Sequence, residues 1–158
     1  MKRLVIFTAV LLLMYGCTEG KDTSQDEVVL KHVVIQYNNL LAEGYRNLNM
    51  TELSEVATEE RAMKAYYHMS ALGEARTKMD SKLQKIDFLD IKFLSSIRAE
   101  VRTREVWDYI HINIDTEKVT LENSVTYELK YTIINQSDRW LVSNIDVLTE
   151  EEEKDGEQ

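Results

Sequence analysis

Residues whose types and spacing could do chemistry are sparse in this sequence. The three histidines, His32, His68 and His111, lie far apart and lack the spacing of metal ligands. The sequence has no glycine-rich phosphate loop and no serine in a nucleophile motif. We therefore predict no metal site and no cofactor.

One carboxylate interrupts an apolar, strand-like segment. Asp108 lies within "VWDYI" and would be a catalytic candidate if it pointed into a pocket. The simpler interpretation is a strand carboxylate that faces outward. Nearby Arg102 and Arg104 share one parity of this segment, whereas Glu105 takes the other. We expect the two arginines to pair across strands with Glu122 or Glu128.

The lone cysteine, Cys17, follows an uncharged apolar run at residues 4–15, which Lys2 and Arg3 precede. This run is shorter than the roughly 20 residues that a membrane-spanning helix needs, and it fits the apolar region of a signal peptide. An exported protein with one cysteine cannot form an intramolecular disulfide. Cys17 therefore calls for another explanation.

The pair of Gly16 and Cys17 after "LLLMY" resembles the lipobox of bacterial lipoproteins, in which a small residue precedes a cysteine that is diacylated. Met14 and Tyr15 depart from the residues that this family prefers. The resemblance implies a signal peptide at 1–16, a lipidated Cys17 and a polar tether at 17–25. It also implies an extracytoplasmic, membrane-anchored location, in the periplasm or at the outer membrane of a Gram-negative source. An ordinary secretion signal or a retained apolar anchor are the alternatives.

The composition is acidic, with a formal net charge of −9 over 158 residues. Nucleic acid is therefore a poor partner, since its binding depends on basic side chains. Part of the charge lies in "TEEEEKDGEQ" at 149–158, which we predict to be a disordered tail. The chain has no proline and five glycines, and residues 26–148 should form one domain.

Apolar residues recur at steps of three and four from Asp26 to Leu48 and predict a long helix. Thr51 begins a short turn, "TELSEVA". Thr58 is a candidate N-cap for a second helix, which we expect to continue to about Lys85.

The period changes to two after Ile86, where part of "FLDIKFLSSI" should be a first strand. A long strand follows, and "DTEK" and "NQSD" are turns around a cleanly alternating strand at 119–134. The last strand changes parity near Ser143, which predicts a kink or bulge there. Helices followed by an antiparallel meander give an α+β fold.

Two segments carry a further resemblance. "VIQYNNLLAEGYRNLNMTELSEVATEE" and "VTYELKYTIINQSDRWLVSNIDV" resemble the opening and the closing hairpin of nuclear transport factor 2-like domains. This resemblance covers roughly residues 26–148. It implies N-terminal helices packed in a curved antiparallel sheet, a cone with a pocket at its open end.

The same resemblance places Tyr37 where ketosteroid isomerase has a tyrosine that hydrogen-bonds an oxyanion. That chemistry also needs a carboxylate base and a protonated acid, and no base matches in "ATEERAMKAYYHM". Tyr37 and Asp108 are thus weak catalytic candidates. We expect Tyr37 to be a packed aromatic, and we assign a ligand pocket to Tyr37, Tyr66, Trp107 and Tyr127.

Together these features predict a membrane-tethered, non-catalytic binding or assembly module. It would contact the membrane through its lipid anchor and bind a protein partner or a small apolar ligand. A homodimer is plausible for this fold class. The competing hypotheses are a pocket enzyme of the ketosteroid isomerase or dehydratase type and a carrier of apolar ligands.

Overall fold

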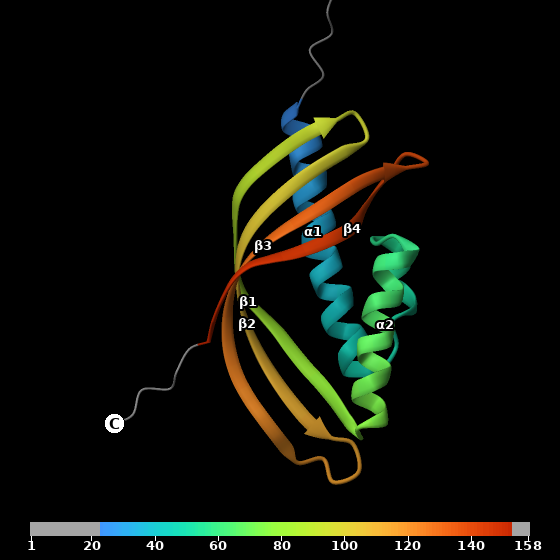
Figure 1. Ribbon diagram of the computed structural model, residues 1–158, viewed down its shortest axis with the longest axis vertical. Coiled ribbons are helices and arrows are strands. Elements are labelled where there is room, and N and C mark those ends of the chain that lie inside the picture. The colour runs from blue at the N-terminus through green and yellow to red at the C-terminus, as the bar shows by residue number, and fades with distance from the viewer. Residues whose placement is uncertain (1–22, 153–158) are drawn as a thin grey trace, which may run out of the picture.

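The computed structural model describes residues 23–152, which form two helices followed by a four-stranded antiparallel sheet (Figure 1). The elements in chain order are α1 (Thr23–Asn47), the 3-10 helix η1 (Thr51–Glu55), α2 (Glu59–Glu74), β1 (Thr77–Ser95), β2 (Arg98–Asn113), β3 (Val119–Gln136) and β4 (Arg139–Glu152). The predicted α+β fold, with N-terminal helices packed in a curved antiparallel sheet, is confirmed. The predicted signal peptide at 1–16, Cys17 and residues 153–158 lie outside the described residues.

α2 begins where a polar side chain satisfies one of its first backbone N–H groups. Thr58 caps α2, because its hydroxyl accepts a hydrogen bond from the backbone N–H of Arg61 at 3.3 Å. The predicted cap is confirmed. α1 starts at Thr23, so residues 23–25, which the sequence assigned to a tether at 17–25, are helical, and residues 17–22 lie outside the described residues.

The expected end of α2 near Lys85 is wrong. The helix ends at Glu74, Arg76 adopts a positive φ of 54°, and β1 begins at Thr77. A bulge contributes to the error: the pairing of β1 with β2 shifts between Leu83 and Lys85, within the segment assigned to the helix, and a second shift lies beyond that segment, between Phe88 and Asp90. Each bulge turns a two-residue step into a three-residue step on the same face of the strand, which imitates a helical period.

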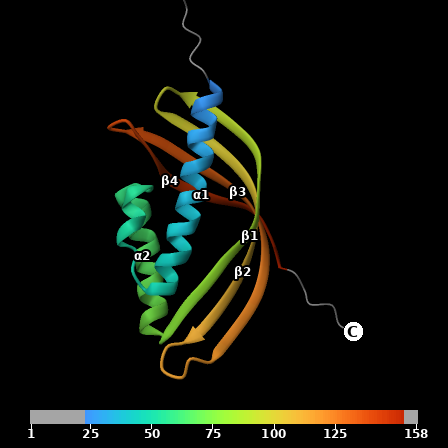
Figure 2. The same ribbon diagram turned by 180° about the vertical axis from the view of Figure 1, so that it is seen from behind.

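The sheet is a simple meander in the order β1-β2-β3-β4, and its concave face holds α1 (Figure 2). In β4 the register against β3 shifts between Thr132 and Ile133, which leaves Ser143 as an extra residue. This confirms the parity change predicted near Ser143.

β4 continues further than expected, because Thr149 pairs with Glu128 and Glu152 pairs with Val125. Residues 149–152, assigned from the sequence to a disordered tail, therefore belong to the sheet. The backbone of β3 offers them hydrogen bonds that their composition does not reveal, and charged side chains are well tolerated on an edge strand.

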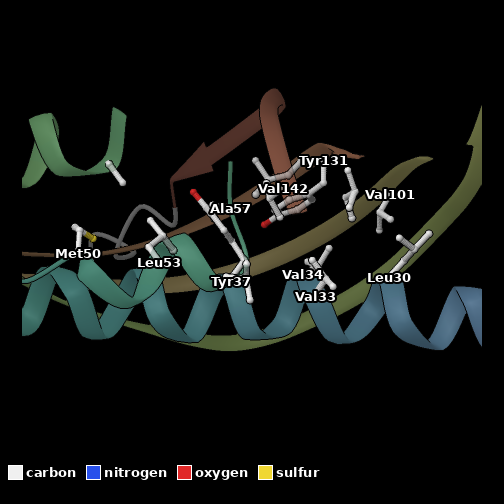
Figure 3. Close-up of a cluster of buried hydrophobic side chains, with 14 of the residues drawn as sticks. Leu30, Val33, Val34, Tyr37, Met50, Leu53, Ala57, Val101, Tyr131 and Val142 are labelled. Carbon is white, nitrogen blue, oxygen red and sulfur yellow. The ribbon is translucent and has the colours of Figure 1, made fainter. Parts of the chain in front are cut away.

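The core lies between the helices and the concave face of the sheet (Figure 3). Fully buried apolar side chains come from α1, η1 and three strands, and include Leu30, Val34, Leu53, Val101, Ile133 and Val142. Over residues 23–152, neither helix combines the length and the apolarity needed to cross a bilayer.

Candidate functional site

A buried carboxylate lies at the centre of the concave face. Glu105 on β2 is fully buried, because its parity directs it toward the helices together with Thr103 and Trp107. Thr103 Oγ1 donates to Oε1 of Glu105 at 2.8 Å, and Trp107 Nε1 donates to Oε2 at 2.8 Å. The carboxylate thus receives two hydrogen bonds from its own strand.

Two further donors reach Glu105 from other elements. Asn38 Nδ2, on α1, donates to Oε2 at 3.1 Å, and the Tyr131 hydroxyl, on β3, donates to Oε1 at 2.8 Å. The Tyr131 hydroxyl also lies 3.1 Å from Asn38 Oδ1. Burial, reinforced by Glu105, raises the pKa of Tyr131 well above its usual value, so this phenol keeps its proton and acts as a donor. We call Asn38, Thr103, Glu105, Trp107 and Tyr131 the Glu105 network.

Tyr37 lies beside this network and is held from α2. The Arg61 Nε donates to the Tyr37 hydroxyl at 2.7 Å, and the guanidinium carbon lies 5.6 Å from the centre of the Tyr37 ring. The Tyr37 and Tyr131 rings meet edge to face at 6.3 Å. Burial raises the pKa of Tyr37, although the neighbouring Arg61 opposes that shift.

A cavity of about 380 Å³ opens beside these side chains, on the concave side of the sheet. A neighbouring hollow of about 350 Å³ shares Leu41, His68, Trp107, Tyr109, Tyr127 and Glu150 with it, and we treat the two as one concave cavity. The rest of the wall is mainly apolar or aromatic and includes Tyr45, Met79, Val125, Leu129, Ile145 and Val147.

Aromatic rings form one wall of the concave cavity. Trp107 and Tyr109 stack at 6.0 Å with an interplanar angle of 16°, and Tyr109 meets Tyr127 edge to face at 6.4 Å. Burial is the main cause of a raised pKa at Tyr109 and Tyr127. Within residues 23–152, one buried side-chain polar atom has no hydrogen-bond partner, and it is Oδ1 of Asn123 in this wall.

The structure brings together three of the four residues that the sequence assigned to a pocket. Tyr37, Trp107 and Tyr127 line the concave cavity. Tyr66 does not: its side chain is 46% exposed and lines a separate hollow of about 480 Å³ between α2 and the β3–β4 turn.

The two catalytic candidates lie on opposite faces of the sheet. Tyr37 is on the concave side, whereas Asp108 has the opposite parity from Trp107 and accepts a hydrogen bond from Gln84. On the same convex face Arg102 forms an ion pair with Glu128, one of the partners expected for it. The structure therefore does not join Tyr37 and Asp108 into one site.

The three histidines do not come together as one group, although His68 and His111 both line the concave cavity. His68 lies on α2, where its Nδ1 is 2.6 Å from the Tyr45 hydroxyl, while His32 is on α1 and His111 on β2. Within the part of the chain that the structure describes, no group of three or more metal-ligating side chains occurs.

Sequence reasoning missed Glu105, Asn38 and Tyr131 as a connected set. The available signal was the parity of Glu105 in "VRTREVW", which places it with Val101, Thr103 and Trp107 rather than with the arginines. A carboxylate on the apolar parity of a central strand requires buried hydrogen-bond donors. Their identity depends on α1 and β3, which no local pattern reveals.

Comparisons with known proteins bear on the fold. No family model matches the sequence, and no curated protein sequence matches it. Among solved structures, the chain is similar to the intermembrane-space region of the chloroplast protein ARC6. The TM-score is 0.67 at 14% sequence identity, over 75% of this chain and 93% of that one. At this identity the likeness establishes a shared fold.

Proposed function

We propose that the protein is a non-catalytic binding module, tethered to a membrane through a lipid on Cys17, whose concave cavity holds a small apolar ligand. The single observation that carries the proposal is this cavity, walled by aromatic and aliphatic side chains on the concave face, between the Glu105 network and the β2–β3 turn. Cavities that bind small molecules are typically apolar with a few placed polar groups. The nuclear transport factor 2-like resemblance agrees with a pocket at this position.

The polar groups of the cavity support binding rather than turnover. Both oxygens of Glu105 already accept two hydrogen bonds each, so the carboxylate is held in place and engaged. Asn123 Oδ1 is different, because it is buried and unpartnered in the wall. A ligand with one hydrogen-bond donor on an apolar body would satisfy that oxygen if the Asn123 side chain rotated to expose it to the cavity.

The proposed address rests on the N-terminal sequence. A diacylated Cys17 would hold the protein stably at a bilayer, since two acyl chains suffice for lasting attachment. The ARC6 domain of similar fold comes from an intermembrane space. We extend a membrane-bounded, extracytoplasmic setting to this chain as part of the proposal.

The cavity can be tested with Nile red, an uncharged fluorescent probe of apolar sites. Leu41 lines both parts of the concave cavity, so Leu41→Trp should fill it and abolish saturable Nile red binding. Ile35→Trp is the matched control, because Ile35 lies on the same helix with its side chain 38% exposed. Equal binding by both variants would refute a ligand site in the cavity. Native mass spectrometry of the purified protein should also show a retained small molecule.

The anchor has an independent test. Cells supplied with labelled fatty acid should label the native protein and not Cys17→Ser, and the substituted protein should leave the membrane fraction. Label on both forms would disprove lipidation at Cys17.

A further inference from the structure

Two segments that lie at one end of the molecule each carry exposed apolar side chains. Figures 1 and 2 show that the start of α1 and the β1–β2 turn lie at the same end, opposite the β2–β3 turn. Ile97, in the β1–β2 turn, is 62% exposed, and Val28, in the first turns of α1, is 66% exposed. Val29, next to Val28, and Leu94, near the end of β1, are also exposed. We call Val28, Val29, Leu94 and Ile97 the tether-end patch.

The turn that carries Ile97 is held in place by hydrogen bonds. The Ile97 backbone N–H donates to Ser95 Oγ at 3.3 Å, and its carbonyl accepts from the backbone N–H of Asn135 at 2.9 Å. Turns of this kind usually carry small polar residues. An isoleucine at this point presents an apolar side chain to the outside, with Arg98 exposed next to it.

The chain that precedes α1 identifies what this end faces. Residues 18–22 separate Cys17 from Thr23, the first residue of α1, so the Cα atoms of Cys17 and Thr23 lie at most roughly 20–22 Å apart even in a fully extended chain. A lipid on Cys17 therefore keeps the start of α1 within that distance of the bilayer. Val28 lies little more than one helical turn further along α1.

We propose that the tether-end patch lies in the interface of the membrane to which Cys17 is anchored. This inference rests on the lipidation of Cys17 and goes beyond it, because a tether alone would let the domain tumble freely above the bilayer. The patch adds a second point of contact from the β1–β2 turn and fixes the orientation of the domain. Arg98 suits that contact, since an arginine beside apolar side chains can reach lipid phosphates while its stem stays in the interface.

Spin labelling of the full lipidated protein in phosphatidylcholine vesicles tests the orientation. Because acylation consumes the thiol of the lone cysteine, Ile97→Cys and Val28→Cys each introduce one free thiol for a nitroxide. Val119→Cys is the matched control, since Val119 is 56% exposed and borders the β2–β3 turn at the opposite end. The labels at 97 and 28 should be less accessible to a water-soluble nickel chelate, and more accessible to oxygen, than the label at 119. The label at 119 should remain accessible to nickel.

The outcomes separate this inference from the proposed function. The intact mass of each protein reports whether Cys17 is acylated: without acyl chains, the anchor and the orientation both fail. If the acyl chains are present but all three labels stay accessible to nickel, the orientation alone is refuted. Dipolar broadening between labels at 97 would place a second copy of the chain on the patch and would likewise overturn it.

Discussion

The hydroxyl of Tyr131 on β3 lies 2.8 Å from Oε1 of Glu105 on β2. Both side chains are fully buried, so this contact joins two strands inside the core rather than at the surface. Hydrogen bonds to a buried charge are individually strong, and the loss of one partner leaves the others unsatisfied. The Glu105 network is therefore where we expect the largest effects of substitution.

Replacement of Glu105 should distinguish its hydrogen bonds from its charge. Glu105→Leu leaves the buried donors of Asn38 and Trp107 without an acceptor and should lower the free energy of unfolding by about 3 kcal/mol or more. In Glu105→Gln the amide nitrogen can donate to the Thr103 and Tyr131 hydroxyls, so the loss should be smaller, about 1 kcal/mol. Urea unfolding measures both.

A matched surface change controls for that measurement. Glu122→Leu removes an exposed carboxylate on β3 and should change the free energy of unfolding by less than about 0.5 kcal/mol. Equal losses for Glu105→Leu and Glu122→Leu would contradict the assigned role of the network.

Alkaline pH should weaken the fold through its buried tyrosines. Burial, helped by Tyr37, raises the pKa of Tyr45 from its usual 10.0 to about 12. The folded state thus holds the phenol proton more tightly than the unfolded state, so the stabilisation is complete below pH 10 and is lost as the pH rises toward 12. Urea unfolding at a series of pH values, with tyrosinate absorbance as a second signal, measures the decline. Tyr45→Phe should reduce its slope, and an identical slope would exclude Tyr45 as a cause.

The N-cap of α2 should contribute measurably to the free energy of unfolding. Thr58→Ala removes the hydroxyl that accepts from the Arg61 backbone N–H and should cost about 1 kcal/mol of stability. Thr58→Ser keeps an acceptor at the same place and should be close to neutral. If both variants unfold at the same urea concentration, the hydroxyl does not stabilise α2.

The convex face should tolerate change. Arg102→Ala breaks an ion pair with Glu128, in which the Arg102 side chain is 45% exposed and the Glu128 side chain 16%, and a pair with one partner open to water contributes little. We expect a loss under about 1 kcal/mol, smaller at high salt because ions screen the pair. Double-mutant analysis with Glu128→Ala isolates the pairwise energy. A coupling above about 2 kcal/mol would show that this face is more than a solvated surface.

Much of the fold could be predicted because the signals were local. The apolar period of α1, the Thr58 cap and the alternation in β3 each depend on neighbouring residues, and each matches the structure. The end of α2 and the end of β4 could not be predicted in this way. A bulge in β1 imitated a helical period, and residues 149–152 owe their strand to the backbone of β3.

The candidate site was less predictable, because it is assembled across elements. Trp107 and Tyr127, which the sequence assigned to a pocket, lie on the same face of the sheet, and both line the cavity with Tyr37. Tyr66 lines a separate hollow, and this could not be predicted because an apolar stripe on a helix does not indicate which neighbouring element covers it. The donors to Glu105 come from α1 and β3, far apart in the chain, so only the folded arrangement reveals them.

The Glu105 network also divides the domain into unequal halves. Toward the β1–β2 turn, Leu30, Val101 and Ile133 are packed without exposure, whereas toward the β2–β3 turn the sheet borders the concave cavity. Amide protons in the packed half, toward the β1–β2 turn, should exchange with solvent only on global unfolding. Those around the cavity should exchange through small local openings. A ligand could then enter and leave the concave cavity through these local openings while the packed half stays folded.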